Sequence, residues 1–183
     1  TSNLETERIP KELTPTFEEY WYQSKVLINN LHKMITMAMK CEHTDDIFAS
    51  NMTNGFVSLR VNYYPPISSA NNTHSRLSDH RDFCGFGLLK ANYPGLEIYS
   101  HKVGKWLPIK EHKNNNIIVI PGEFIENWTN GQYKSPLHRV VSYNENVNSN
   151  DVRISFASFS GPDFESIIDI LPCQINSNIN KRI

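Results

Sequence analysis

HRDFCGFGLLK, at residues 80–90, is the stretch that decides the fold. A histidine and an aspartate stand two residues apart, and an apolar run broken by glycines follows them directly. Alternate side chains of a β-strand point the same way, so His80 and Asp82 would face one side and Arg81 the other. A His-x-Asp pair alone is usually an accidental surface pair. The apolar continuation instead favours a strand over 80–90, with both polar groups at the mouth of a buried sheet.

A third side chain of matching chemistry occurs in SPLHRVV, at residues 135–141. Alternation along this predicted strand places His138 on one face with Pro136 and Val140. A lone histidine on an apolar face is more often a satisfied core residue than a ligand, and that alternative stays open. If His138 lies beside the first pair, two histidines and one carboxylate suit non-haem Fe(II), with positions left for oxygen and a co-substrate. The remaining histidines fit less well: His32, His43, His74, His101 and His112.

An anion-binding pair is predicted near the C-terminal end. Arg153 and Ser155 stand two apart on a predicted strand and therefore share a face. A guanidinium grips a carboxylate through two parallel hydrogen bonds, and the hydroxyl can reach the second oxygen. Asn62 and Tyr64, on the polar face of a strand over 56–64, can add hydrogen bonds to the same anion. The alternatives are an ordinary ion pair of Arg153 with a local acid, and a polar strand rim.

Length and charge narrow the function classes. The chain has 183 residues, enough for one domain with its own core. Lys and Arg total 18 against 19 Asp and Glu, a net charge of -1, so we expect neither a nucleic acid nor a membrane as partner. A small-molecule substrate is expected instead, while the oligomeric state has no sequence signal. Three scattered cysteines give no disulfide framework and favour a reducing, cytoplasmic setting: Cys41, Cys84 and Cys173.

Periodicity predicts a mainly β chain with a helical lead-in over 14–50 and a jelly-roll core over 55–172. An amphipathic helix is expected from Thr14 or Thr16 to about Cys41, with an apolar face of Leu27, Leu31, Met34, Ile35 and Ala38. A short helix should begin at Thr44, and a polar loop should cover 68–78. Strands are predicted over 56–64, 80–90, 96–100, 105–109, 117–120, 137–143 and 152–159, with a turn at 102–104 and an Asn-Gly hairpin over 128–132. Short strands with frequent turns indicate a sandwich or barrel, and we predict a jelly roll.

The same residues resemble one known family over much of the chain. The motifs, in family order, are RVNYYPP at 60–66, HRD at 80–82, PGLEI at 94–98, GKW at 104–106, IPG at 120–122, WTNGQYKS at 128–135, LHRV at 137–140 and RISF at 153–156. In these motifs the chain resembles the isopenicillin-N-synthase-like branch of the 2-oxoglutarate- and Fe(II)-dependent dioxygenases. That family folds as a double-stranded β-helix, the jelly roll predicted above.

The resemblance implies an oxidoreductase with Fe(II) as cofactor and 2-oxoglutarate as co-substrate, with ascorbate as an additional candidate. It would hydroxylate or desaturate a small organic substrate with O2 and release succinate and CO2. The implied metal ligands are His80, Asp82 and His138. The implied co-substrate-binding residues are Arg153, Ser155, Asn62 and Tyr64. The implied substrate-binding residue is Phe159.

Three departures from the family pattern accompany this resemblance. Arg81 stands where Thr is common, Glu123 stands where Asp is usual after Pro-Gly, and the loop from His138 to Arg153 is longer than in many members. We also expect a single domain over 1–183 that lacks the usual N-terminal part of the family. Two alternatives remain: an iron oxidase of the isopenicillin N synthase type that works without 2-oxoglutarate, and a catalytically silent jelly-roll binding module.

Overall fold

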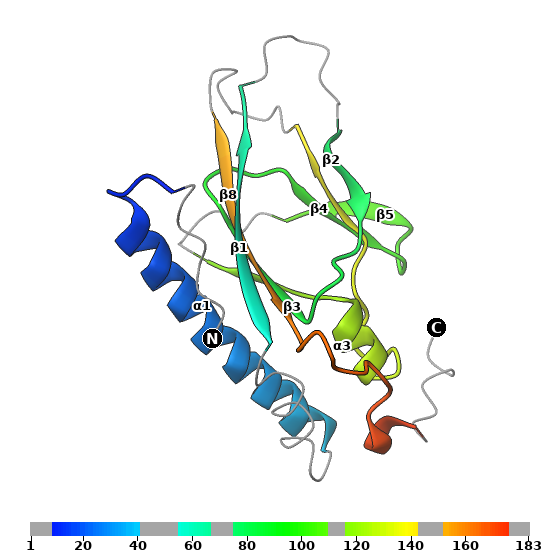
Figure 1. The fold of residues 1–183 in the computed structure, drawn as a ribbon. Coiled ribbons are helices and arrows are strands. Elements are labelled where there is room, and N and C mark those ends of the chain that lie inside the picture. The colour runs from blue at the N-terminus through cyan, green and yellow to red at the C-terminus, as the bar shows by residue number, and fades with distance from the viewer. Residues whose placement is uncertain (1–8, 41–54, 67–74, 110–115, 143–151, 176–183) are drawn as a thin grey trace.

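The computed structural model describes residues 9–40, 55–66, 75–109, 116–142 and 152–175. Within these ranges eight strands form two antiparallel sheets of four strands each, a jelly roll, as predicted (Figure 1). One sheet has the order β1-β8-β3-β6: β1 Phe56–Tyr64, β8 Arg153–Gly161, β3 Phe86–Ala91 and β6 Ile118–Pro121. The other has the order β2-β7-β4-β5: β2 Ser75–His80, β7 His138–Val141, β4 Leu96–Ser100 and β5 Lys105–Pro108.

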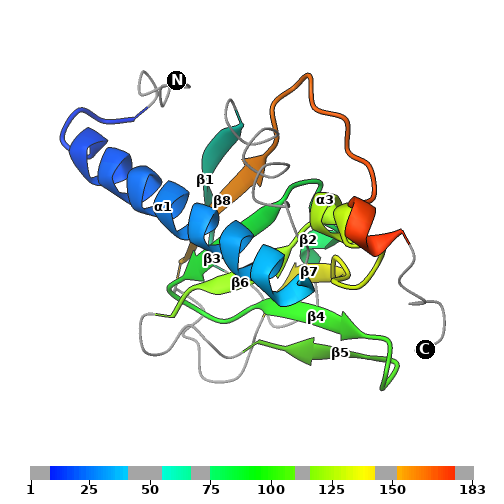
Figure 2. The same cartoon turned by 90° about the horizontal axis from the view of Figure 1, so that it is seen from below.

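A long helix, α1 (Thr14–Met39), packs across the outer face of the first sheet (Figure 2). Tyr20 lies against Phe156 of β8 at a ring distance of 5.6 Å, and the Ser158 hydroxyl donates to Ser24 at 3.1 Å. The buried face is rotated from the predicted one, because small polar side chains bring the helix close to the sheet. It comprises Ser24, Ile28, His32, Ile35, Thr36 and Met39, whereas the predicted Met34 is 63% exposed.

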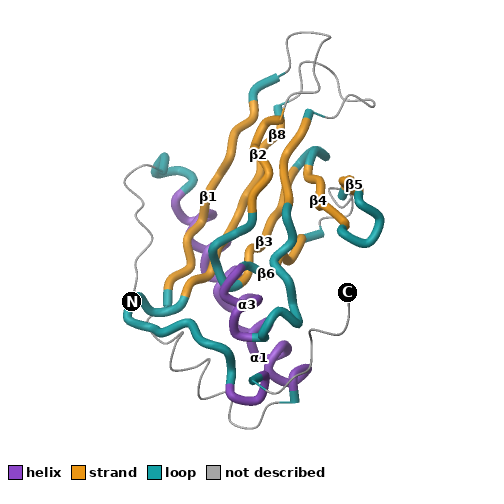
Figure 3. The backbone as a smooth tube through the Cα atoms, turned by 90° about the vertical axis from the view of Figure 1, so that its right-hand side faces the viewer, coloured by secondary structure: helices purple, strands orange, loops and turns teal. Residues whose placement is uncertain are grey.

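A short helix, α3 (Glu123–Trp128), lies at one end of the sheets (Figure 3). Its apolar side chains join the end of α1 in a core cluster: Ile35, Met39, Phe86, Phe124, Ile125, Trp128 and Leu171. The sequence prediction of a hairpin over 128–132 was wrong. Asn130 and Gly131 do take positive φ angles of 50° and 78°, as an Asn-Gly turn would, but they end this helix, since the Gly131 N–H donates to the Glu126 carbonyl at 2.8 Å.

The predicted single strand over 80–90 was also wrong, and the break matters for the site. Residues 75–80 belong to one sheet and residues 86–91 to the other, so residues 81–85 cross between the sheets. The N–H of Gly85 donates to the Ser160 carbonyl at 2.7 Å, which ties the end of the crossing segment to β8. Ser75 to Ser78, expected in a loop, belong to β2.

At its C-terminal end, strand β1 turns its polar face inward. Val61 and Tyr63 are 42% and 65% exposed, whereas Tyr64 is buried and Asn62 half-buried. Helix α1 reaches β1 near Val57, whose carbonyl accepts from the Trp21 indole at 2.5 Å. Asn62 and Tyr64 instead line a pocket between the sheets. Val61 and Tyr63, near the C-terminal end of β1, are therefore outside the core.

Several smaller predictions have mixed outcomes. The turn at 102–104 is present, with Gly104 at a φ of 64°. Strand β6, predicted over 117–120, is an edge strand with Val119 39% exposed. Cys84 is free and buried, and Cys173 is disulfide-bonded, which the cysteine count did not predict.

The short helix predicted from Thr44 lies outside the described residues. Neither described helix combines the length and apolar character needed to cross a membrane.

Candidate metal centre

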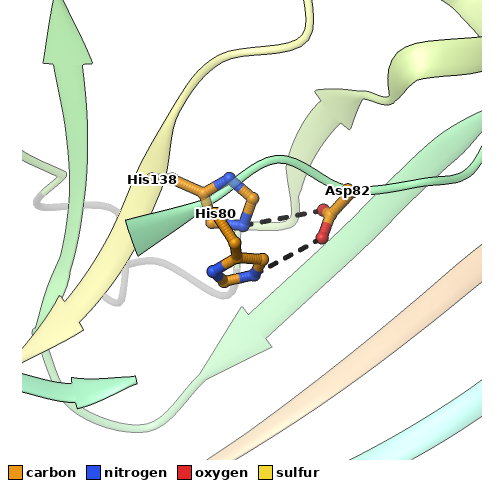
Figure 4. Close-up of side chains that lie close together, drawn as sticks. All are labelled: His80, Asp82 and His138. Carbon is orange, nitrogen blue, oxygen red and sulfur yellow. Dashed lines mark ion pairs between the residues drawn. The ribbon is translucent and has the colours of Figure 1, made fainter. Parts of the chain in front are cut away.

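Three side chains converge at the open end of the second sheet (Figure 4). His80 ends β2 and His138 begins β7, and the two residues are paired directly across the ladder. Asp82 comes from the crossing segment. Its Oδ1 lies 3.6 Å from His80 Nε2, and its Oδ2 lies 3.6 Å from His138 Nε2. The structure brings the three predicted residues together, but Asp82 lies on a loop and not on the same strand as His80.

Both imidazoles are oriented by backbone carbonyls two residues earlier. His80 Nδ1 lies 2.8 Å from the Ser78 carbonyl oxygen, and His138 Nδ1 lies 3.1 Å from that of Pro136. A carbonyl accepts only, so a neutral imidazole held in this way carries its proton on Nδ1 and has its Nε2 lone pair available for a metal. Metal-binding histidines are held in this way in proteins. Both lone pairs are thus directed toward the Asp82 carboxylate.

The charge state of the group suits a divalent cation. Burial lowers the pKa of His138, outweighing the opposite effects of the Pro136 carbonyl and the Asp82 carboxylate. His138 is therefore uncharged at neutral pH, the form that binds metals. Burial, and then the carboxylates of Asp82 and Glu123, raises the pKa of the Cys84 thiol, which stays protonated. One ligand atom from each of the three residues lies within 4.8 Å of the others, and two imidazoles with one carboxylate fit non-haem Fe(II).

The crossing segment is fixed by the first turn of α3. The N–H groups of Gly122, Glu123 and Phe124 donate to the carbonyls of Gly85, Asp82 and Cys84 at 2.7, 2.9 and 3.1 Å. These N–H groups have no partner within a helix, so the segment satisfies them. The backbone of Asp82 is thereby held by the helix.

Two glycines of the site were missed in the sequence. A Cβ on Gly122 would overlap the Cys84 carbonyl, so only glycine lets the helix approach the crossing segment. A Cβ on Gly87 would lie 3.2 Å from Asp82 Oδ2 and would crowd the carboxylate. Gly122 belongs to the quoted IPG motif, but its packing role has no local signal, because the contact joins residues far apart in the chain.

The predicted anion-binding residues form two opposed pairs across β1 and β8. Asn62 faces Ser155 and Tyr64 faces Arg153 in the ladder register. The Asn62 amide donates to the Ser155 hydroxyl at 3.3 Å, and the Arg153 guanidinium lies 4.9 Å from the Tyr64 ring centre. Arg153 is only 5% exposed, and its Nε donates to the Tyr93 carbonyl at 3.1 Å. The structure thus brings these four residues together. We call Arg153 and Ser155 the anion clamp; Asn62 contacts Ser155, and Tyr64 contacts Arg153.

One pocket between the sheets joins the metal-binding group to the anion clamp. The space between its walls is about 450 Å³ when the open solvent at the mouth is included, and its remaining wall is largely apolar. All eight predicted site residues line it: Asn62, Tyr64, His80, Asp82, His138, Arg153, Ser155 and Phe159. Phe159 lies beneath the guanidinium of Arg60 at 5.7 Å. The three ligands and the guanidinium therefore line the same pocket.

Known proteins share both this sequence and this fold. The chain is 33% identical to thebaine 6-O-demethylase of Papaver somniferum over 168 residues, which cover 88% of this chain and 43% of that protein. It is 40% identical to 1-aminocyclopropane-1-carboxylate oxidase 1 of Arabidopsis thaliana over 98 residues, or 52% of this chain and 29% of that protein. A full-length Neurospora crassa protein, solved in complex with alpha-KG, superposes with a TM-score of 0.79 at 24% identity, over 98% of this chain and 55% of that one.

The chain spans about half the length of the relatives it matches, or less. All of the described strands fall within residues 56–162, and these residues match the 2OG-Fe(II) oxygenase superfamily. The chain belongs to this superfamily, whose cofactor is Fe(II) and whose co-substrate is 2-oxoglutarate.

Proposed function

We propose that the chain is the catalytic core of a 2-oxoglutarate- and Fe(II)-dependent dioxygenase that hydroxylates or desaturates a small organic substrate, with succinate and CO2 as co-products. The observation that carries this proposal is one pocket lined by two kinds of group. His80, Asp82 and His138 line it together with Arg153 and Ser155. A dicarboxylate with a 2-oxo group matches these residues. Its 2-oxo acid end can chelate a metal, and its far carboxylate can pair with a guanidinium.

In this proposal His80 Nε2, His138 Nε2 and an Asp82 oxygen hold Fe(II), and three protein ligands leave further positions open. The iron, when bound, supplies oxygen activation coupled to oxidative decarboxylation of the co-substrate. The Arg153 guanidinium and the Ser155 hydroxyl bind the far carboxylate through charge-assisted hydrogen bonds. Apolar side chains of the pocket exclude water from the reacting groups, among them Leu88, Leu96, Ile120, Val140 and Ala157.

The direct test is anaerobic addition of Fe(II) and then 2-oxoglutarate to the purified chain. We expect the weak visible absorption band that arises when a 2-oxo acid chelates Fe(II). Asp82→Ala should abolish the band. Asp79→Ala, at an exposed position on the same strand as His80, should retain it. A folded chain that shows no band with both additions would overturn the proposal.

An iron oxidase that does not use 2-oxoglutarate is the second candidate. The observation in its favour is the 40% identity to a protein named as an oxidase. In such an enzyme the Arg153–Ser155 pair would bind a carboxylate of the substrate itself. The two candidates differ in one product, because only the dioxygenase converts 2-oxoglutarate to succinate. Oxygen uptake without succinate would favour the oxidase, and a chain that binds no metal would favour a silent binding module.

We also propose a cytoplasmic location, which the free thiol of Cys84 supports and the disulfide of Cys173 opposes. Alkylation of thiols in intact cells, followed by mass spectrometry of the peptide containing Cys173, tests it. Alkylated Cys173 is the expected result. An unmodified peptide that becomes reactive only after reduction would contradict a reducing compartment.

A further inference from the structure

Arg81 lies between two of the three ligands, and its side chain turns away from them toward α3. Its Nη1 lies 3.4 Å from Glu126 Oε2 and also donates to the Ser135 carbonyl. The same Glu126 oxygen accepts from the Ser135 N–H at 2.8 Å. Arg81 and Glu126 therefore hold both the carbonyl and the N–H of one buried residue, Ser135, which is 1% exposed. We call these three residues the Arg81 clamp.

The Arg81 clamp joins the two chain segments that supply every ligand. Arg81 is adjacent to both His80 and Asp82. Ser135 precedes Pro136, whose carbonyl orients His138 Nδ1. Glu126 belongs to α3, the helix that also holds the crossing segment through its first turn. A shift of the Arg81 clamp would thus change the separation between the first two ligands and the third.

Strand pairing sets His80 opposite His138 but fixes neither the rest of the segment nor Asp82. The ladder between β2 and β7 shifts register between Ser75 and Leu77 and again between Leu77 and His80. Asp82 lies beyond the end of β2 and has no ladder partner. The Arg81 clamp acts where the ladder is irregular or absent.

We propose that Arg81 and Glu126 are positioning residues of the metal centre, which hold the His80–Asp82 segment at the separation from His138 that metal binding requires. This inference rests on the proposed metal site. It assigns a role to the arginine that distinguishes this chain at the middle of the His-x-Asp motif. Groups that hydrogen-bond directly to metal ligands change metal affinity by roughly 10- to 100-fold, and Arg81 and Glu126 act one contact further out.

The contact geometry allows a sharp choice of variants. A single nitrogen of Arg81 reaches both oxygens, so the single ammonium of a lysine can replace it. Arg81→Met removes the donor and retains an unbranched side chain. We expect Arg81→Met and Glu126→Ala to bind metal roughly tenfold more weakly than the unaltered chain, and Arg81→Lys to stay within about threefold of it.

Arg139 provides the matched control. It directly follows a ligand, His138, and its Nε pairs with Glu97 Oε2 at 2.8 Å, with comparable exposure. Glu97 and Arg139 are, however, direct partners in the regular β4–β7 ladder, which holds their backbone without the ion pair. Arg139→Met should therefore lower the thermal stability of the chain while leaving its metal affinity within about twofold.

The experiment is titration of the metal-free chain and each variant with Co(II), an air-stable divalent probe whose visible absorption reports its ligands. Circular dichroism confirms that each variant is folded at the titration temperature. Three results together support the inference: Arg81→Met binds Co(II) more weakly than the unaltered chain, Arg81→Lys restores the affinity, and Arg139→Met does not lower it. Equal affinity in Arg81→Met and the unaltered chain, or equal losses in Arg81→Met and Arg139→Met, overturns it alone. Failure of the unaltered chain to bind Co(II) overturns it together with the proposed metal site.

Discussion

Arg153 and Ser155 contribute differently to the anion clamp, and substitutions separate their roles. Arg153→Lys keeps the charge but loses the planar fork that binds two carboxylate oxygens, so we expect about a tenfold loss of 2-oxoglutarate affinity. Ser155→Ala removes one hydrogen bond, worth about 1 kcal/mol, and should weaken binding about fivefold. Calorimetric titration of the Fe(II)-loaded chain under nitrogen measures both. Unchanged 2-oxoglutarate affinity in Arg153→Lys would exclude this arginine as the anchor.

His32 ties a pH dependence of stability to the docking of α1. It is 4% exposed and packs on Phe86 at a ring distance of 5.1 Å. Burial lowers its pKa to about 4 from the usual 6.5. Between these two pKa values the unfolded chain binds a proton at His32 and the folded chain does not. The contribution of neutral His32 to the free energy of unfolding is therefore complete above pH 6.5 and is lost as the pH falls toward 4.

The corresponding measurement is the free energy of unfolding in urea at pH 7 and pH 5. His32 alone should cost the unaltered chain about 2 kcal/mol over this interval. Between pH 7 and pH 5, the free energy of unfolding of His32→Leu should fall by about 2 kcal/mol less than that of the unaltered chain. Ile35→Val, which changes a buried side chain of the same helix face but no titratable group, should keep the original dependence. Identical pH profiles for the unaltered chain and His32→Leu would show that the imidazole is not kept neutral by burial.

The approach of α3 to the crossing segment depends on Gly122. An added methyl would meet the backbone of Cys84 and Asp82, so the helix or the segment must move. We expect Gly122→Ala to lower the free energy of unfolding by about 1–3 kcal/mol and to weaken metal binding. Gly104→Ala, at a positive φ but in open space, should cost about 1–2 kcal/mol and leave metal binding unchanged. Full metal affinity in Gly122→Ala would show that α3 does not position Asp82.

Local periodicity predicts some elements well and others not. Helix α1 and strands β1 and β4 follow from patterns contained within each segment, and the structure confirms their bounds closely. The break between β2 and β3 does not follow from local pattern, because residues 81–85 leave the strand to accept hydrogen bonds from α3. The Asn-Gly pair likewise suits both a hairpin and a helix end. In such cases the tertiary partner decides the conformation.

The candidate site was more predictable than the path of the chain through it. All eight predicted residues line one pocket; ligand chemistry and strand alternation indicated seven of them, and the family resemblance alone indicated Phe159. Strand alternation was nevertheless the wrong reason for Asp82, since that residue lies beyond the strand. Gly87 and Gly122 were missed because a close approach between distant segments has no local pattern.

Metal binding should stabilise the molecule as a whole. A ligand that binds only the folded chain raises the free energy of unfolding by about 2.7 kcal/mol at a hundred times its dissociation constant. We therefore expect Fe(II), added under nitrogen, to raise the melting temperature of the unaltered chain and of Asp79→Ala. Asp82→Ala should show no such rise. Differential scanning calorimetry measures these melting temperatures. Equal rises in Asp82→Ala and Asp79→Ala would place the metal elsewhere.

The central claim is that one pocket holds both the metal and 2-oxoglutarate. A crystal structure of the chain grown anaerobically with Mn(II) and 2-oxoglutarate tests it most directly, because Mn(II) scatters anomalously and takes the same nitrogen and oxygen ligands. We predict one anomalous peak among His80, Asp82 and His138, with the far carboxylate of 2-oxoglutarate against Arg153 and Ser155. A peak at another place, or a carboxylate that does not meet Arg153, would contradict it.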